Sequence, residues 1–276
     1  MKLNRFLLAP VLLWFAFFLA VPLALVVVVS LLSKDAYGAL LWAFSGESYL
    51  RVFEWVHFRI LFESLKLATL TTVICLVIGV LISWAMATAT SRWRQVFLLL
   101  VTLPFLTNLV IRIYAIRVFV GFEGPLQKSL NLFGIPFDPF SLTQNEPLVL
   151  YGMVTTYLPF MVLPLFSAFE KFDFAMVEAA QDLGASTWKI LKDVIVPNLK
   201  RPMVNGSLLV FIPSLGEYLI PDLLGGAKTM LYGNLITHQF LRARDWPFGA
   251  ALSVVMMLVL LTCVLMVVRR VEGRRG

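Results

Sequence analysis

The stretch FLLAPVLLWFAFFLAVPLALVVVVSLL, residues 6–32, is an unbroken apolar run close to the N-terminus. About 20 apolar residues in a helix cross the ~30 Å hydrocarbon layer of a bilayer, whereas the apolar region of a secretory signal peptide is roughly 7–15 residues long. Lys2 and Arg5 precede the run, as basic residues precede a signal peptide. Its length nevertheless favours a retained membrane span over a cleaved signal.

The composition of the whole chain agrees with a membrane protein. Of its 276 residues, 60% are hydrophobic and 14% are charged, against about 45–50% and 25% in soluble domains. The net charge of +7 could suggest a nucleic-acid partner, but the basic residues are spread over separate short segments. We predict an integral membrane protein that binds no nucleic acid. Cys75 and Cys263 lie in apolar runs without neighbouring ligands, so neither a disulfide nor a metal site is predicted.

Apolar windows predict six transmembrane helices in a single transmembrane domain, residues 1–276. The spans lie at about 6–32, 65–88, 96–120, 147–169, 203–224 and 248–269. The fold class is all-α, because backbone groups in lipid must bond within their own segment and the runs are too uniformly apolar for barrel strands. With six spans both termini share one side, and that side carries basic residues at the higher density, so both termini are predicted to be cytoplasmic.

This topology leaves one long cytoplasmic loop, at about 170–202, which contains EAAQDLGASTWKILKDVIVPN, residues 178–198. Its pattern predicts two short amphipathic helices, each with one apolar face. The apolar faces comprise Met176, Val177, Ala180 and Leu183, then Trp188, Leu191 and Ile195. Gly184 is expected to end the first helix, Ser186 to cap the second, and Pro197 to stop it.

Five positions of this loop resemble the EAA loop of ATP-binding-cassette (ABC) importer permeases, whose pattern is E-A-A-x3-G-x9-I-x-L-P. The matched residues are Glu178, Ala179, Ala180, Gly184 and Pro197, and Val194 and Val196 stand where the pattern has Ile and Leu. The resemblance implies that the loop couples to a groove on a separate ATPase subunit, a contact of the helix-in-groove kind. The alternative is an ordinary helix pair lying on the membrane surface.

Three further stretches resemble the permease subunits of spermidine/putrescine importers. They are LPFLTNLVIRIYAIRVFVG (103–121), LPFMVLPLFSAFEK (158–171) and PDLLGGAKTMLYGNLITHQFLRARDWPFGAA (221–251). The last stretch favours this branch over the sulfate, molybdate or iron permeases, although another small solute remains the alternative. The similarity covers about residues 50–270, with the permease core at about 60–270.

The family resemblance implies the type I ABC importer permease fold in a bacterial inner membrane. It also implies a second homologous permease subunit, two ATPase subunits and a periplasmic or extracellular substrate-binding protein. The outer loops at about 33–64, 121–146 and 225–247 are long enough to receive that protein.

No catalytic or phosphate-binding pattern is present, so the chain is predicted not to be an enzyme. LLGGAKTM, residues 223–230, lacks the first glycine of a phosphate-binding loop and has Ala227 before Lys228. His57 and His238 are not accompanied by a nucleophile in a recognisable motif. We expect no cofactor on this chain, with ATP and Mg²⁺ on the partner ATPase. A secondary transporter fits six spans but leaves the EAA pattern unexplained, and a membrane-embedded enzyme lacks a catalytic constellation.

A path for linear polyamines should offer carboxylates and aromatic faces. Glu217, between Gly216 and Tyr218 inside a predicted span, is the first candidate to contact substrate, with Asp222 at the outer mouth. The alternative for Glu217 is a salt bridge to Arg112 or Arg117 of the third span. Weaker candidates are Asn108, Tyr114, Asp245 and Trp246, of which Trp246 could equally anchor the chain at the membrane interface.

Overall fold

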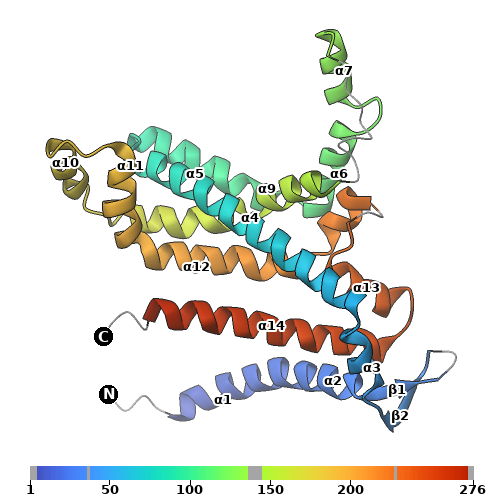
Figure 1. Ribbon diagram of the computed structural model, residues 1–276. Coiled ribbons are helices and arrows are strands. Elements are labelled where there is room, and N and C mark those ends of the chain that lie inside the picture. The colour runs from blue at the N-terminus through green and yellow to red at the C-terminus, as the bar shows by residue number, and fades with distance from the viewer. Residues whose placement is uncertain (1–4, 36–37, 136–144, 227–228, 273–276) are drawn as a thin grey trace. The chain divides into compact units, whose positions relative to one another are not determined.

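The computed structural model describes residues 5–35, 38–135, 145–226 and 229–272 (Figure 1). The chain divides into two compact units. One comprises Met1–Leu61 and Tyr232–Leu265, and the other comprises Phe62–Leu231 and Met266–Gly276. Nearly all described elements are helices, as the sequence predicts, and residues 227 and 228 of the LLGGAKTM stretch lie outside the described residues.

The first unit begins with the predicted N-terminal span. Three segments continue one another without a break: α1 (Arg5–Phe15), the π-helix η1 (Ala16–Ala20) and α2 (Val21–Ser30). The 18-residue apolar window within Pro10–Ser30 contains no residue buried within the chain. Ser30, at the end of the helix, is buried, with its hydroxyl 2.7 Å from that of Tyr49. The apolar part of the helix therefore offers its surface to lipid or to another protein.

A hairpin, two short helices and one long helix complete the first unit. They are β1 (Leu32–Lys34), β2 (Leu40–Phe44), α3 (Glu47–Val52), α13 (Tyr232–Leu241) and α14 (Trp246–Glu272). The strands pair antiparallel, with Leu32 opposite Phe44, and add a small two-stranded sheet that the sequence did not predict. The core of this unit consists of Val52, Tyr232, Leu235, Phe248, Ala251 and Leu252.

The second unit contains most of the remaining helices. They are α4 (Trp55–Thr88), α5 (Ser91–Leu106), α6 (Leu109–Val120), α7 (Pro125–Leu132), α9 (Glu146–Phe169), α10 (Ala175–Asp182), α11 (Thr187–Ile190), η2 (Leu191–Ile195), α12 (Val196–Leu215) and η3 (Pro221–Gly225). Helix α4 begins ten residues before the predicted span at 65, within the range of the first unit.

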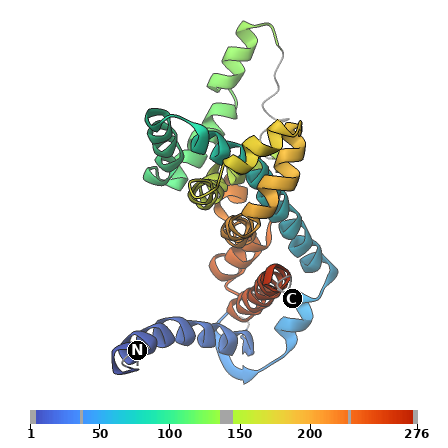
Figure 2. The ribbon, with the colours of Figure 1, turned by 90° about the vertical axis from the view of Figure 1, so that its left-hand side faces the viewer.

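Helices α9 and α12 lie side by side, as the two ribbon views agree (Figures 1 and 2). Met161 of α9 packs where two glycines leave room for it. A Cβ at Gly79 of α4 would lie 2.7 Å from Met161 Cγ, and one at Gly206 of α12 would lie 2.8 Å from its Sδ. Small residues allow such close approach of membrane helices, so these glycines bring α4 and α12 against α9.

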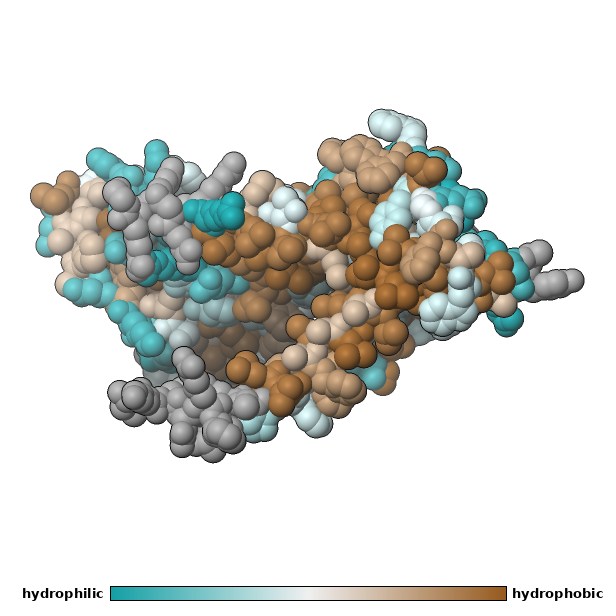
Figure 3. Space-filling model, turned by 90° about the horizontal axis from the view of Figure 1, so that it is seen from below, coloured by the Kyte–Doolittle hydropathy of each residue, from teal (hydrophilic) through white to brown (hydrophobic). Residues whose placement is uncertain are grey.

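Among the described residues, four helices are long and apolar enough to cross a membrane by themselves. They are Pro10–Ser30, Trp55–Thr88, Glu146–Phe169 and Trp246–Arg269. The span predicted at 96–120 is bent, because α5 and α6 meet at 96° across Thr107 and Asn108. The span predicted at 203–224 is interrupted, since α12 ends at Leu215 and a helix resumes only after Tyr218. Figure 3 shows the broad apolar surface of one face.

Candidate coupling elbow and transport path

Residues 175–197, which we call the elbow, contain both helix caps predicted from the sequence. Helix α10 ends at Asp182, and Gly184, with a φ of +75°, follows its C-cap residue Leu183. The N–H of Gly184 donates to the carbonyl of Gln181 at 2.8 Å, and that of Ala185 to Ala180 at 3.0 Å. This is the Schellman pattern, which requires a left-handed residue. Ser186 Oγ accepts a hydrogen bond from the N–H of Lys189 at 3.4 Å and caps α11.

Pro197 does not stop the second helix, so that prediction was wrong. Segments α11, η2 and α12 continue from Thr187 to Leu215 without a break, and we call this run the rod. A proline has no N–H and crowds the carbonyl four residues earlier. The π turn Leu191–Ile195 ends two residues before the proline and widens the helix there. The second half of the elbow and the fifth predicted span are therefore parts of one helix.

The apolar surface of the elbow is narrower than predicted. Val177, Ile190 and Ile195 are buried in the core of the second unit, so Ile195 does not belong to an exposed stripe. Leu183 is 87% exposed and Trp188 is 73% exposed, on either side of Gly184. The elbow is thus fixed to its own unit by buried side chains and presents two large apolar residues at its corner. Glu178 and Ala179 are exposed as well.

A Cβ added at Gly184 would meet no atom within 4 Å. The requirement for glycine at this position within the chain therefore comes from the backbone angle alone and not from crowding. The open space beside it leaves room for a close approach by another protein.

The interruption after α12 is organised by Glu217, whose side chain is buried at 7% exposure. Its Oε1 accepts hydrogen bonds from the backbone N–H groups of Tyr218, Leu219 and Ile220 at 3.1, 2.9 and 3.3 Å. Its Oε2 accepts one from the hydroxyl of Tyr157 on α9. The carboxylate thus caps the helix that resumes after Tyr218, where a negative charge is favoured.

The salt bridge predicted as the alternative for Glu217 is absent from this arrangement. The ion pairs among the described residues do not join Glu217 to Arg112 or Arg117. The carboxylate instead accepts hydrogen bonds from four donors of the chain, three on Oε1 and one on Oε2. Sequence reasoning missed Tyr157; the signal for it was a phenol in an apolar helix, since a buried tyrosine hydroxyl usually has a partner.

Two other predicted path residues are exposed to solvent at the same break. Tyr218 is 47% exposed and Asp222 is exposed on η3. The N–H of Asp222 donates to the carbonyl of Tyr218 at 3.1 Å, a one-turn separation that places both residues on the same side of the helix. An aromatic ring and a carboxylate are therefore neighbours here, which is the combination that an ammonium group prefers.

The remaining candidates take structural roles or lie apart. Asn108 Oδ1 accepts from the N–H groups of Val110 and Ile111 at 2.8 and 3.4 Å and caps α6 at its bend. Tyr114 is exposed on α6. Trp246 belongs to the first unit and meets the ring of Phe240 edge to face, with 5.8 Å between centroids.

Asp245, also in the first unit, holds three segments of that unit together. Its side chain is 3% exposed and its Oδ2 accepts hydrogen bonds from Lys34 at 2.6 Å and Arg51 at 2.9 Å. Burial by itself would raise the pKa of this carboxyl, but the hydrogen bonds from Lys34, Arg51 and the N–H of Phe248 outweigh it and lower the pKa. The carboxylate joins the hairpin, α3 and the start of α14.

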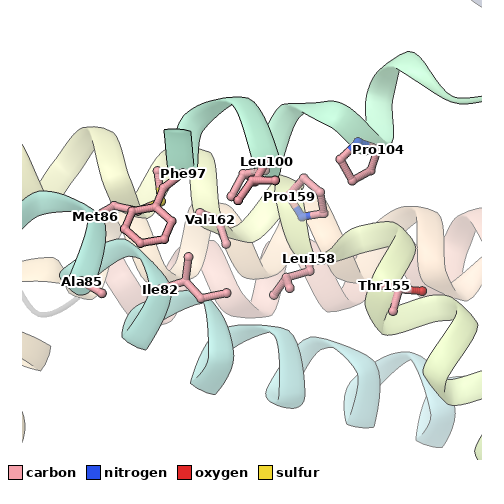
Figure 4. A pocket seen from close by; sticks show the side chains of 11 residues that line it. Ile82, Ala85, Met86, Phe97, Leu100, Pro104, Thr155, Leu158, Pro159 and Val162 are labelled. Carbon is pink, nitrogen blue, oxygen red and sulfur yellow. The ribbon is translucent and has the colours of Figure 1, made fainter. Parts of the chain in front are cut away.

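A cavity of about 330 Å³ lies between α4, α5 and α9 (Figure 4). Its described lining contains no charged side chain. The hydroxyl of Thr155, which lines the cavity, donates a hydrogen bond to the carbonyl of Tyr151 at 2.9 Å. An ammonium group there would lack a carboxylate, so this cavity does not suit a polyamine. Within the described residues, no cluster of three His, Cys, Asp or Glu side chains could hold a metal ion.

Comparison with known proteins agrees with these features. The chain is 39% identical over 253 residues to the spermidine/putrescine transport system permease protein PotB of Haemophilus influenzae, covering 92% of this chain and 88% of the relative. The Escherichia coli protein of the same name is 37% identical over 247 residues, covering 90% of each chain. The molybdenum transport system permease ModB of Azotobacter vinelandii is 30% identical over 59% of this chain and 70% of its own length.

The fold is shared with solved transporters. A bacterial ABC transporter that imports the acidic polysaccharide alginate matches with a TM-score of 0.77 at 18% identity, covering 99% of this chain and 96% of that one. The same kind of transporter in complex with an alginate-bound periplasmic protein matches at 0.75, covering 96% and 92%. A family model described as the binding-protein-dependent transport system inner membrane component matches residues 1–275. The chain therefore belongs to this family, the inner-membrane permease subunits of ABC importers.

Proposed function

We propose that this chain forms half of the translocation path of an ATP-driven importer for linear polyamines such as spermidine and putrescine. The observation that carries the proposal is the 39% identity over 92% of the chain to a permease of a spermidine/putrescine transport system. An exposed carboxylate beside an exposed tyrosine at the break after α12 suits the same cations. The molybdenum permease is a more distant relative, and an open carboxylate does not favour an oxyanion.

The other half comes from a second homologous permease, and the energy comes from two ATPase subunits that bind the elbow. Leu183 and Trp188 enter a groove on one ATPase, with Glu178 and Gly184 at its edge. No cofactor resides on this chain, since ATP and Mg²⁺ bind the ATPases. Both termini lie in the cytoplasm, and a soluble binding protein delivers the substrate from the other side.

In this arrangement Tyr218 and Asp222 contact the substrate, and Glu217 positions them. Its carboxylate fixes the start of the helix that carries Asp222, while Tyr157 holds the carboxylate against α9. This differs from a direct role for Glu217, because its carboxylate is buried and already holds four donors of the chain. Tyr114 and Asn108 belong to the adjoining helix α6 and are secondary candidates for the path.

Uptake by the reconstituted complex tests the proposal. The two permeases, the ATPases and the binding protein are placed in proteoliposomes, and radiolabelled spermidine and putrescine are supplied with and without internal ATP. We expect uptake of at least one polyamine that needs both ATP and the binding protein. Polyamine uptake by this chain alone without ATP, or accumulation of molybdate with no polyamine, would contradict it.

The substrate contact is tested separately with Asp222→Asn and, as the matched control, Asp222→Glu. A hydrogen bond to a charged group contributes about 1.5–3 kcal/mol, so removing the charge should raise the KM for uptake about tenfold or more with unchanged abundance. Asp222→Glu keeps the charge and should stay within about threefold of wild type. An unchanged KM for Asp222→Asn would remove Asp222 from the path.

A further inference from the structure

Arg112 on α6 has no counter-charge among the described residues. Its Nε is sealed from solvent and has no acceptor among the described residues, and none of the described ion pairs includes its guanidinium. Its neighbour Ile111 and the nearby Val118 are exposed and apolar, as expected of a helix in contact with lipid. A charged group in such a helix is costly unless something accepts its hydrogen bonds. The terminal nitrogens of the guanidinium, unlike Nε, are not sealed from solvent, so an acceptor from outside the described residues can reach them.

Beside this arginine is a cavity of about 630 Å³, enclosed by α6, α7 and the start of α9. Arg112 is the one charged residue in its described wall. The other walls are apolar apart from the backbone and Tyr151, and include Ile116, Phe119 and Leu148. The cavity thus combines a single cationic donor with a large apolar volume.

We propose that the Arg112 cavity binds an anionic phospholipid, with the phosphate accepting hydrogen bonds from Arg112 and the upper part of an acyl chain against the apolar walls. The planar guanidinium matches phosphate geometry in a two-bond contact. Basic pockets between membrane helices on the cytoplasmic side take such headgroups, and the same pairing of guanidinium and phosphate applies at this end of α6. A polyamine is excluded because Arg112 would repel it.

Two features of the cavity favour an anionic phospholipid over a zwitterionic phospholipid and over a partner protein. Its described wall offers no carboxylate for the ammonium of a zwitterionic phosphatidylethanolamine, so phosphatidylglycerol or cardiolipin is favoured. A carboxylate from a partner protein could also neutralise Arg112, but a single side chain would leave the apolar volume unfilled. A lipid does both, because its phosphate pairs with Arg112 and its acyl chain fills the apolar volume.

Native mass spectrometry of the assembled transporter tests the proposal. The complex is purified in mild detergent, stripped of loose lipid and examined for retained phosphatidylglycerol or cardiolipin, as wild type, Arg112→Gln and Arg117→Gln. Arg117 is the matched control, because it is exposed on the same helix and does not line the cavity. We expect Arg112→Gln to lower anionic-lipid occupancy about fivefold or more, and Arg117→Gln to leave it unchanged.

A second variant keeps the test decisive if Arg112→Gln does not assemble. Ile116→Trp fills the cavity while it retains the arginine, and it should also lower lipid occupancy. Equal occupancy in wild type and in whichever variant assembles would overturn the proposal. So would unchanged lipid together with separation of the two permeases in Arg112→Gln, since that result would assign the acceptor to the partner protein.

Discussion

Replacing Gly184 by valine should weaken docking of the ATPase subunit on the elbow while the permease stays folded. A residue with a side chain pays about 1–2 kcal/mol in the left-handed region, and more when it is β-branched. Gly184 has a φ of +75°, and a Cβ there meets no atom within 4 Å, so no steric term adds to this cost. The variant therefore shifts the elbow away from its observed bend by about 1–2 kcal/mol, which is a factor of 5–30 in population.

Gly134 is a matched control. Its φ is +70°, and a Cβ there also meets nothing within 4 Å, but it follows α7 and lies outside the elbow. Gly134→Val should therefore carry a similar backbone cost without changing the surface proposed for the ATPase.

The assay is binding-protein-stimulated ATPase activity of the reconstituted complex, titrated with ATPase subunit. Because Gly134 lies in the predicted outer loop at about 121–146, basal ATPase activity without binding protein is titrated in parallel, and the two variants are compared there. We expect Gly184→Val to need about 5–30-fold more ATPase subunit for half-maximal basal activity, and Gly134→Val to resemble wild type. Membrane abundance should be equal in the two variants. A wild-type titration in Gly184→Val, or equal loss in both, would refute the argument that the bend at Gly184 is a docking requirement.

Three further predictions concern single contacts. Glu217→Ala leaves the hydroxyl of Tyr157 and three N–H groups without their acceptor, so it should lower the stability of the complex by about 1–3 kcal/mol. We expect a lower melting temperature and a lower maximal uptake rate. A variant with the melting temperature of wild type would show that the cap is dispensable. Gly206→Leu should cost about 1–3 kcal/mol by overpacking against Met161, measured by thermal unfolding, and Met161→Ala in the same chain should recover part of it. The pKa of Asp245 is lowered below its ordinary value of 3.8, so the carboxylate stabilises the folded chain above that pH, and this contribution is lost as pH falls through the lowered pKa. The melting temperature of wild type should therefore decline in that acid range more steeply than that of Asp245→Asn. Parallel curves of melting temperature against pH would contradict the assignment.

Features that depend on a few consecutive residues were predictable from the sequence. The N-terminal span follows from the length of its apolar run, and Gly184 and Ser186 from cap chemistry that is local to the chain. Pro197 was not predictable in the same way, because a proline stops a helix only if the preceding turn cannot widen. Whether a π turn forms there depends on Ile195 being drawn into the core of the second unit.

Contacts between segments far apart in the chain could not be predicted from the sequence. The partner of Glu217 is Tyr157, sixty residues earlier, and nothing local distinguishes this tyrosine from Arg112 or Arg117 as a partner. The ties from Asp245 to Lys34 and Arg51 likewise join segments about two hundred residues apart. Sequence spacing could identify the polar residues in apolar surroundings, but the fold decided which of them meet.

The rod supplies a direct physical connection between the elbow and the break at Glu217. At 1.5 Å per residue, Thr187–Leu215 extends for roughly 40 Å, which exceeds the ~30 Å hydrocarbon layer. The basic residues Lys189, Lys192 and Arg201 lie in its first half and favour water, so the excess length projects from the membrane at that end. From Arg201 to Glu217 the path is about 20 Å, which places the break inside the layer. A continuous helix transmits a displacement of its exposed end to its buried end, and here the buried end leads directly to the carboxylate that holds Tyr218 and the start of the next helix. A movement imposed at Trp188 therefore acts on the proposed substrate contacts through one helix.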